Sequence, residues 1–556
     1  MSSIILHSFL ITILFTPFGL FLSNENKKDL EYFSSQLIYG LIILSFIALF
    51  LNFFFPLNIF LNTIILVLPI FLLINKRKIY FNKQFIIFLF FTTTLILLLI
   101  TESNVYRPDA GLYHLPYVKI LNDEKIIFGL SNLHSRYGHI SIIQYLAAIS
   151  NNFIFKENGI IFAQALIASS VIINFTNKIY NYIKTKKYNF HFFYLISVLI
   201  FITYKMNRYS EYGNDAPAHF LFFFLISEIL VIKKNDIREI CNSLIYILFI
   251  FLNKVTLLLC SLFALLLIKK NEITNLIKLR RFYFFLIFAI LWFTKNIIIS
   301  SCLIYPVKYT CFNNLLWSDL KTVENLSYEN EAWTKDWPNY LKQSKNDKTN
   351  KISIKEYSKK FYWIKYWSNG HLKKILSIMV PYLIFLLMIT LFLISQRKKV
   401  IKLSINKTHL IMILILILSC LIWFIKVPVF RYGYSYLISL VSLIFALICY
   451  KYFEYKNNIS NFFNFLLIFC FIVFSTKNLI RINKTDNDYF NYPWPKFYAM
   501  DEKNIEHGVV ELSLKGKKFY KPIKYCMFSS SPCGSYGIRD NLDMILKKNY
   551  YVLYIK

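Results

Sequence analysis

Cysteine is scarce in this chain, with nine residues in 556. A small secreted fold held together by disulfides would need a far higher density, so that class is excluded. Five cysteines lie in apolar runs, where they act as small hydrophobic residues: Cys241, Cys260, Cys420, Cys449 and Cys470. The other four form two closely spaced pairs in polar or boundary segments, Cys302 with Cys311 and Cys526 with Cys533. Both pairs are candidate disulfides if their segments face an oxidising compartment.

Acidic residues are also few, with 30 Asp and Glu against 63 Lys and Arg, for a formal net charge of +33. Such an excess can indicate a nucleic-acid partner, but the basic residues cluster in short segments between apolar runs. That distribution is typical of the loops that orient a membrane protein. We therefore expect membrane lipids, and no nucleic acid, around this chain.

Several catalytic signatures are missing. The chain has no G-x-x-x-x-G-K-[ST] motif, which argues against an ATP-driven pump, and no G-x-S-x-G hydrolase elbow. His114, His134 and His139 lack the close spacing of H-E-x-x-H, which argues against a zinc site. The first residues lack a basic region and a small-residue cleavage site, so the first apolar run is expected to remain as a span.

Long apolar windows dominate what is present, because 56% of the residues are hydrophobic. They predict an all-α polytopic membrane protein with about fourteen transmembrane helices. The windows cover residues 4–22, 35–55, 57–75, 84–101, 159–176, 191–204, 216–232, 240–253, 255–268, 282–299, 374–395, 408–425, 433–450 and 460–478. The stretch 240–268 is too long for one crossing, so a break at Asn253 and Lys254 is expected, with two crossings or a re-entrant hairpin.

Alternating these windows puts the basic loops on one side, which the positive-inside rule assigns to the cytoplasm. The segments on the opposite side are 102–158, 205–215, 300–373, 426–432 and the tail from about 482. Both cysteine pairs fall there. In the first of these segments "LYHLPYVKIL" and "GHISIIQYLAAISNNFIF" predict interfacial helices lying on the membrane, and in the tail "GVVELSL" and "YYVLYIK" predict strands.

The chain is accordingly divided into five parts. Residues 1–83 are expected to form N-terminal transmembrane helices and 84–299 a transmembrane core that includes the first outer segment. Residues 300–373 form an extracytoplasmic segment, 374–481 the C-terminal transmembrane helices, and 482–556 an extracytoplasmic tail.

Carboxylates gather at the start of two outer segments. Glu102 and Asp109 lie in "ESNVYRPDAGLYH", and Asp215 lies in "EYGNDAP" directly before an apolar window. Partial desolvation raises the pKa of a carboxylate, which suits a catalytic base. The alternative is local structure, because an aspartate in such sequences also caps a helix or completes a turn.

Three cations lie at outer ends of apolar windows, against the positive-inside preference: Lys254, Lys295 and Arg431. Snorkelling to lipid headgroups explains a single such residue. Several around one cavity would also suit a lipid-linked phosphate, whose charge they neutralise as a bond to it breaks. Arg431 follows Pro428 in a short turn and is the best candidate for a fixed phosphate contact.

The segments "PDAGLYHLPYVKIL", "GLSNLHSRYGH", "KNIIISSCLIYP", "VPVFRYG" and "CMFSSSPC" are similar to a group of uncharacterised bacterial multi-spanning membrane proteins. The layout as a whole resembles the GT-C superfamily of membrane glycosyltransferases, from about residue 102 to the C-terminus. The resemblance implies transfer of a sugar from a polyprenyl phosphate to a glycan, lipid or protein acceptor of the cell envelope. It also implies a bacterial inner-membrane protein whose active site faces the periplasm.

In that family a carboxylate of the first outer loop deprotonates the acceptor or binds a divalent cation, and Asp109 holds the matching position. Arg431, Lys254 and Lys295 correspond to the donor-phosphate cations. Two departures stand out. The windows before residue 84 precede the usual GT-C beginning, and a single aspartate replaces the adjacent acidic pair of many members. Whether Asp109 holds Mg²⁺ or Mn²⁺ is therefore left open.

The resulting hypothesis assigns Asp109 as base, Glu102 or Asp215 as its assistant, and His114 as a group that orients a substrate hydroxyl or phosphate. Three tryptophans, Trp317, Trp333 and Trp337, either stack on sugar rings or form a membrane-interface belt. One rival class is a flippase or transporter for lipid-linked sugars, which would carry charges in the middle of its spans. Another is an O-antigen polymerase or ligase, whose chemistry would lie in the large segment 300–373. The enzyme hypothesis requires Asp109 and Arg431 to share one pocket.

Overall fold

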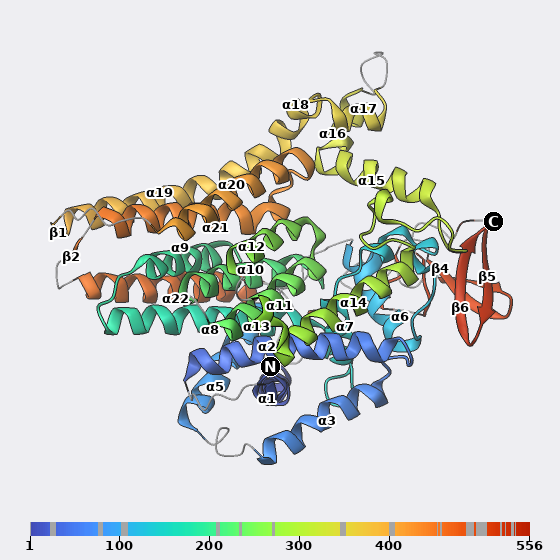
Figure 1. Cartoon of the computed structure of the whole chain (residues 1–556), viewed down its shortest axis with the longest axis horizontal. Coiled ribbons are helices and arrows are strands. Elements are labelled where there is room, and N and C mark those ends of the chain that lie inside the picture. The colour runs from blue at the N-terminus through green and yellow to red at the C-terminus, as the bar shows by residue number, and fades with distance from the viewer. Residues whose placement is uncertain are drawn as a thin grey trace.

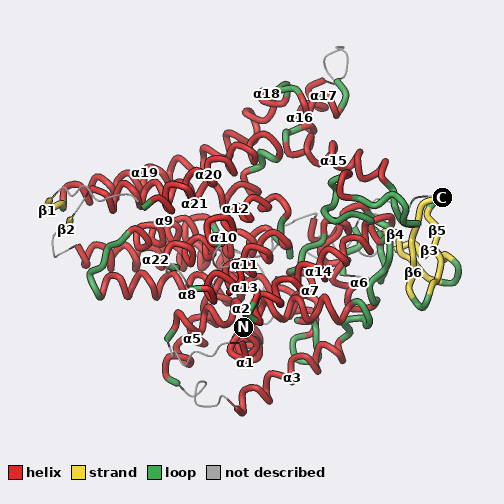
Figure 2. Tube along the Cα trace, viewed as in Figure 1, coloured by secondary structure: helices red, strands yellow, loops and turns green. Residues whose placement is uncertain are grey.

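The computed structural model describes residues 2–22, 29–75, 82–101, 109–206, 212–232, 236–268, 273–344, 352–399, 406–452, 454–455, 459–484, 494–495, 509–522, 525–528, 530–534, 539 and 541–556. Helices make up most of this part of the chain, and short strands lie at its two ends (Figures 1 and 2).

Every apolar window of the sequence falls on a helix. The helices are α1 (Ser2–Leu22), α2 (Leu30–Asn52), α3 (Ile59–Asn75), α5 (Lys83–Ile100), α8 (Phe162–Lys184), α9 (Phe190–Lys205), α10 (Asp215–Val231), α11 (Ile237–Asn253), η5 (Val255–Ser261) with α12 (Leu262–Leu267), α14 (Arg280–Ser300), α19 (Lys373–Ser395), α20 (Lys407–Lys426), α21 (Phe430–Tyr452) and α22 (Ile459–Asn483). Within the described residues, nine helices are long and apolar enough to cross a bilayer. The prediction of a predominantly helical, polytopic membrane protein is thus confirmed at this level.

Local sequence explains how these helices satisfy their polar groups. The Asp29 carboxylate caps α2 by accepting a hydrogen bond of 2.7 Å from the Tyr32 amide. Inside α1, the Ser8, Thr12 and Thr16 hydroxyls each donate to the carbonyl four residues earlier, at 2.6 to 2.7 Å. Hydroxyls bonded back to their own helix are compatible with an apolar environment, because no polar atom is left without a partner.

The helices form a buried centre with an exposed apolar surface. Most of α8 is buried, whereas most residues in the apolar windows of α14, α19, α20 and α22 are only partly buried or exposed. Leu414 of α20 and Phe465 of α22, for example, are 62% and 64% exposed. Large apolar side chains on the outside of a helix bundle are typical of a surface solvated by lipid.

The predicted break at Lys254 is present. Helix α11 ends at Asn253, Lys254 is extended, and the chain returns along α11 as η5 and α12. The returning arm, Val255–Leu267, is among the shorter apolar helices. The two arms form a hairpin whose tip carries Lys254.

The segment after α5 contains η1 (Ala110–His114), α6 (Leu115–Asp123), η2 (Leu130–Asn132), η3 (Ser135–His139), α7 (Ile143–Ile149) and η4 (Lys156–Ile161). Short helices therefore occur where the sequence predicted interfacial ones. Every residue of α7 is buried, however, because α7 packs against α2, α6 and α8. The interfacial position of these helices stays a prediction, and α7 is in addition covered by protein on all sides.

The next large segment, after α14, is a helical lobe. It contains η7 (Lys308–Thr310), α15 (Leu320–Thr334), α16 (Trp337–Ser344), α17 (Ile354–Lys359), α18 (Trp363–Trp367) and η8 (Ser368–Leu372). Its own small core is aromatic: Tyr340, Tyr357, Trp363 and Trp367 are buried there. A further short helix, α13 (Ile273–Ile277), precedes α14.

Strands mark the two ends of the helix bundle. The antiparallel pair of β1 (Arg397–Lys399) and β2 (Glu454–Tyr455), which joins the end of α19 to the segment after α21, lies at the left end in Figure 1. The hairpins β3 (Val509–Leu514) with β4 (Lys517–Pro522), and β5 (Leu542–Lys547) with β6 (Tyr550–Ile555), lie at the right end, as does the helical lobe. Both tail strands predicted from sequence are confirmed. We call the right end, where the tail and the lobe lie, the outer end.

One apolar core runs through the whole bundle. Its buried members range from Ile4 in α1 to Leu553 in β6. The buried members of this core come from the first outer segment, the long helices and the tail, whereas residues 300–373 have two small cores of their own.

Candidate functional site

Four charged side chains from four separate segments meet at the outer end. They are Asp109, just before η1; Asp215, the first residue of α10; Lys254, just after α11; and Arg431, in the first turn of α21. Arg431 Nη2 lies 3.5 Å from Asp109 Oδ2, and Arg431 Nε lies 3.7 Å from Asp215 Oδ2. Lys254 Nζ forms an ion pair with Asp215 Oδ1. We call these four residues the ion cluster.

Helix termini explain the positions of Asp215 and Lys254. A carboxylate at the start of α10 and an ammonium at the end of α11 both complement the helix dipoles. The Asn214 side-chain amide donates a hydrogen bond of 2.5 Å to the Asn253 carbonyl, which joins the two termini. The two charges are thus held beside each other by local sequence.

The turn between α20 and α21 fixes Arg431. The Trp423 indole N–H donates to the Val429 carbonyl at 3.0 Å, and the Trp367 indole N–H donates to the Pro428 carbonyl at 2.6 Å. A Cβ on Gly433 would lie 2.4 Å from the Trp423 ring, so only glycine allows this approach. The motif "VPVFRYG" therefore places Arg431 by packing as well as by charge.

Exposure varies across the ion cluster. The side chains of Lys254 and Asp215 are 7% and 22% exposed, whereas those of Arg431 and Asp109 are 34% and 40% exposed. The two cations and two carboxylates balance, which matters because a cation at the N-terminus of α21 is unfavourable by itself. The Arg431 and Asp109 side of the ion cluster is therefore the more exposed one.

Aromatic rings separate the two cations. Lys254 Nζ lies 3.9 Å from the centre of the Tyr432 ring, and the Arg431 guanidinium carbon lies 5.2 Å from the same centre. Arg431 Nη2 also donates to the Tyr432 hydroxyl at 3.4 Å. On the other side, the Trp333 ring of the helical lobe is 6.0 Å from the guanidinium. All three contacts between a cation and a ring are in the range of cation–π interactions.

His114 lies next to the ion cluster, at the other end of the turn that Asp109 begins. The Gln144 side-chain amide donates to His114 Nδ1 at 2.5 Å, which leaves the proton of a neutral ring on Nε2. A Cβ on Gly213 would be 3.2 Å from that Nε2. Burial lowers the pKa of His114 to about 4, although Asp109 and Asp215 act in the opposite direction. The ring is therefore neutral at pH 7.

Sequence reasoning missed His219. It lies one turn after Asp215 in α10, where its Nε2–H donates to the Arg431 carbonyl at 2.6 Å and its Nδ1 accepts from the Ser435 hydroxyl at 2.5 Å. It thus joins α10 to the start of α21. The available signal was a histidine four residues after an aspartate in "DAPAHF", a spacing that puts both on one helix face.

The structure does not bring Lys295 to the ion cluster. Its ammonium is fully buried and donates to the Ile140 carbonyl at 3.2 Å and to Asn296 Oδ1 at 2.9 Å, and it lies 3.6 Å from the centre of the Trp292 ring. Its role as a donor-phosphate contact is corrected accordingly, because protein groups enclose it. Glu102 lies outside the described residues.

The two cysteine pairs are joined as the sequence suggested, Cys302 with Cys311 and Cys526 with Cys533. Metal ligation fits less well. In the described part of the chain, no three His, Cys, Asp or Glu side chains lie close enough to hold an ion. Asp109 and Asp215 instead face cations. These donors do not fit a resident Mg²⁺ or Mn²⁺, and no step below uses one.

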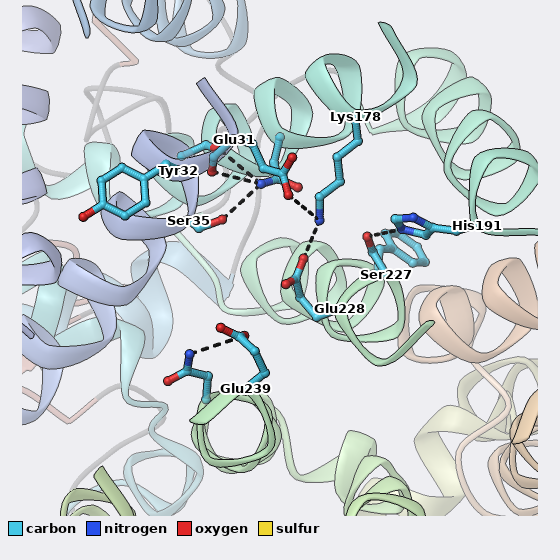
Figure 3. Close-up of polar contacts among 12 residues, drawn as sticks. Glu31, Tyr32, Ser35, Lys178, His191, Ser227, Glu228 and Glu239 are labelled. Atoms are coloured by element: carbon cyan, nitrogen blue, oxygen red, sulfur yellow. Dashed lines mark hydrogen bonds and ion pairs between the residues drawn. The ribbon is translucent and has the colours of Figure 1, made fainter. Parts of the chain in front are cut away.

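A second polar network lies at the opposite end of α8 and α10 (Figure 3). Lys178 of α8 is 2.5 Å from Glu228 of α10 and 3.6 Å from Glu31 of α2. Nearby, the Asn174 amide donates to the Ser34 and Ser35 hydroxyls at 3.1 Å. We call Glu31, Lys178 and Glu228 the Lys178 network. It fastens three helices together and was not singled out from the sequence.

Comparison with known families gives one match. Residues 1–438 match the model of a domain of unknown function (DUF8201), and the chain belongs to this family. The match covers all four residues of the ion cluster and leaves the tail outside. No curated protein and no solved structure matches the chain.

Proposed function

We propose that this DUF8201 member is a membrane glycosyltransferase of the GT-C type. In this proposal it moves a sugar from a polyprenyl-phosphate donor to a glycan, lipid or protein acceptor of the cell envelope. The observation that carries the proposal is the contact between Asp109 and Arg431, which are far apart in sequence and 3.5 Å apart in space. A base and a phosphate-binding cation at one site are what the reaction requires.

The proposed site suits a lipid-anchored donor. The ion cluster lies where α10, α11 and α21 begin or end, so a donor can keep its tail among lipids while its phosphate meets the cations. Holding donor and acceptor together there makes the reaction effectively unimolecular. The large segments outside the long helices, the lobe and the tail, lie at the same end (Figure 1).

Asp109 is the proposed base. It takes the proton of the acceptor hydroxyl as that oxygen bonds to the anomeric carbon of the sugar. The bond between this carbon and the phosphate oxygen breaks, and its electron pair stays on the phosphate. Arg431 and Lys254 stabilise that developing charge, Asp215 keeps Lys254 in place, and the configuration at the anomeric carbon is inverted.

Two further groups contact substrate in this scheme. His114 is neutral and donates from Nε2 to a substrate hydroxyl or phosphate oxygen. Trp333 is the tryptophan placed to stack on a sugar ring, because it is 47% exposed and lies beside Arg431. Trp317 instead packs on Phe128 and donates to the Ile297 carbonyl, and Trp337 stacks on Tyr340 within the lobe.

The proposal includes about fourteen membrane crossings, a bacterial inner-membrane location and a periplasmic site. Support comes from charge and position. The basic strand β1 lies at the end of the bundle opposite the tail strands β4, β5 and β6, as the positive-inside rule expects of a cytoplasmic loop (Figure 1).

Two rival functions each have an observation in their favour. The Lys178 network puts charges between membrane helices, as expected of a flippase or transporter. The helical lobe beside Arg431 would suit an O-antigen polymerase or ligase, whose chemistry lies in a large late segment. Asp109 and Arg431 favour a transferase over both rival functions, because their side chains are partly exposed at the outer end and a substrate could contact them there.

The test is transfer by the full-length protein in proteoliposomes, with a panel of polyprenyl-phosphate sugars and envelope acceptors. Wild type should transfer a labelled sugar, and Asp109→Asn should lose at least about a hundredfold in rate. Asp123→Asn is the matched control, since Asp123 is a similarly exposed carboxylate of the same segment, paired with Lys119. Full activity of Asp109→Asn would exclude the assigned base. Lipid translocation that depends on Lys178, without sugar transfer, would favour the flippase.

A further inference from the structure

The tail reaches the proposed site through one short loop. The Cys526 to Cys533 disulfide closes this loop, and the Met527 amide donates to the Gly111 carbonyl at 2.9 Å. Gly111 lies in η1, between Asp109 and His114. A segment outside the family match therefore contacts the turn that carries two of the proposed site residues.

The contact at Gly111 is close. A Cβ there would lie 2.3 Å from Met527 Sδ, at the end of a flexible side chain, and 3.4 Å from the Tyr525 Cβ, so Met527 packs directly against this turn. Cys526, Met527 and Phe528 are all buried, although they belong to a peripheral tail. Their burial comes from docking on the first outer segment.

The loop is also held on its other sides. The Tyr137 hydroxyl donates to the Cys533 carbonyl, and a Cβ on Gly534 would be 3.0 Å from the Leu133 carbonyl oxygen. The Tyr520 amide of β4 donates to the Pro532 carbonyl at 2.9 Å. The loop is thus fixed between η1, the turn at residues 133–137 and strand β4.

The turn that this loop contacts has an unusual geometry. Residues Ala110–His114 form a π-helical turn, which is rare and concentrated at functional sites. The loop supplies a hydrogen-bond donor, the Met527 amide, to the Gly111 carbonyl of this turn. A disulfide keeps such a short loop in one shape by removing most alternatives.

We propose that the loop closed by Cys526 and Cys533 is a positioning element that holds Asp109 and His114 in place, and that it does so only while the disulfide is intact. A dithiol that reduces the pair forms two cysteine thiols and becomes a disulfide itself, so electrons and protons balance. Reduction then releases η1. The effect on catalysis rests on the proposed function, whereas the effect on η1 does not.

Hydrogen exchange of the full-length protein in detergent, read by mass spectrometry, tests the positioning. Exchange in a peptide spanning residues 109–123 should become faster by on the order of tenfold in C526S/C533S, and in wild type treated with dithiothreitol. The matched control is C302S/C311S, which removes the other disulfide and should leave this peptide unchanged.

Two results would overturn the inference. One is unchanged exchange at 109–123 in C526S/C533S. The other is loss of protection throughout α8 to α11 as well, which would make the disulfide a requirement of the whole fold. Sugar transfer separates this inference from the proposed function. If exchange at 109–123 is faster in C526S/C533S but the wild type transfers no sugar, only the proposed transferase activity is refuted. If C526S/C533S transfers sugar at the full rate although η1 exchanges faster, only the positioning role is refuted.

Discussion

Lys254 and Asp215 form an ion pair that joins the end of α11 to the start of α10. Lys254 is buried, and its ammonium also lies 3.9 Å from the centre of the Tyr432 ring. Asp109 and Arg431, by contrast, form a pair that is more than one-third exposed on both sides. The ion cluster therefore combines a structural pair and an accessible pair.

Asp215→Asn should destabilise the protein by about 3 kcal/mol, because it leaves a buried ammonium without its counter-charge. Asp109→Asn should cost less than about 1 kcal/mol, because its pair is exposed to solvent. Thermal unfolding in detergent measures both. In the double variant D215N/K254M, the loss should be smaller than the sum of the single losses. Equal losses for the two aspartates would contradict the division into structural and accessible pairs.

Arg431→Lys should raise the KM for the lipid-phosphate donor at least about tenfold, since lysine lacks the planar fork that binds phosphate with two hydrogen bonds. Steady-state transfer assays at varied donor concentration measure this. Arg539→Lys is the control, because Arg539 pairs with Asp319 at 2.7 Å, away from the ion cluster. An unchanged KM in Arg431→Lys would remove Arg431 from the donor site.

Stability should fall as the pH is lowered from 7 to 5. Burial lowers the pKa of His114 and His134 to about 4 and that of His139 to about 3, from an ordinary value of 6.5. Between pH 6.5 and these lowered pKa values, the unfolded chain binds more protons than the folded chain. The contribution of the three histidines to the free energy of unfolding is therefore fully present above pH 6.5 and is lost as the pH falls toward 4.

For His114 alone the loss at pH 5 is about 2 kcal/mol. His114→Gln should therefore flatten the fall in Tm between pH 7 and pH 5, as measured by thermal unfolding in buffers of equal ionic strength. A wild-type Tm that is constant over this range would show that these histidines are not buried in the folded protein.

Gly433→Ala should impair transfer and destabilise the protein by about 1 to 3 kcal/mol, because its Cβ would overlap the Trp423 ring. The overlap shifts the start of α21 and with it Arg431. Combining Gly433→Ala with Trp423→Phe should restore part of the stability by shrinking the ring. An alanine at 433 with wild-type Tm and transfer rate would argue against this packing.

Much of the fold was predictable because membrane helices follow from hydrophobic length. Each candidate membrane-spanning helix among the described residues coincides with a predicted window, and the excessive length of the stretch 240–268 predicted the break after α11. Burial was harder to predict. The amphipathic pattern of residues 138–155 suggested a surface helix, yet α7 is enclosed by α2, α6 and α8, which lie at distant positions in the chain.

The candidate site was predictable in part for the same reason. Asp109, Asp215, Lys254 and Arg431 all stood out as charges at the ends of apolar windows, and the ends of neighbouring helices meet. Lys295 satisfied the same rule but points to Ile140 and Asn296, because sequence does not show which face of α14 is enclosed. His219 lies within an apolar run, where its hydrogen bonds to α21 leave no trace in the pattern.

The contact between Arg431 and Asp109 has a consequence for the order of events in a reaction cycle. In the proposed reaction, a donor phosphate that binds Arg431 would displace the Asp109 carboxylate from the same guanidinium. Before that displacement the Asp109 carboxylate would be paired with Arg431, and afterwards it could take the proton of the acceptor hydroxyl. Such competition would impose a compulsory sequence on the two substrates, donor before acceptor, and would keep the site idle toward water and alcohols until a sugar has arrived.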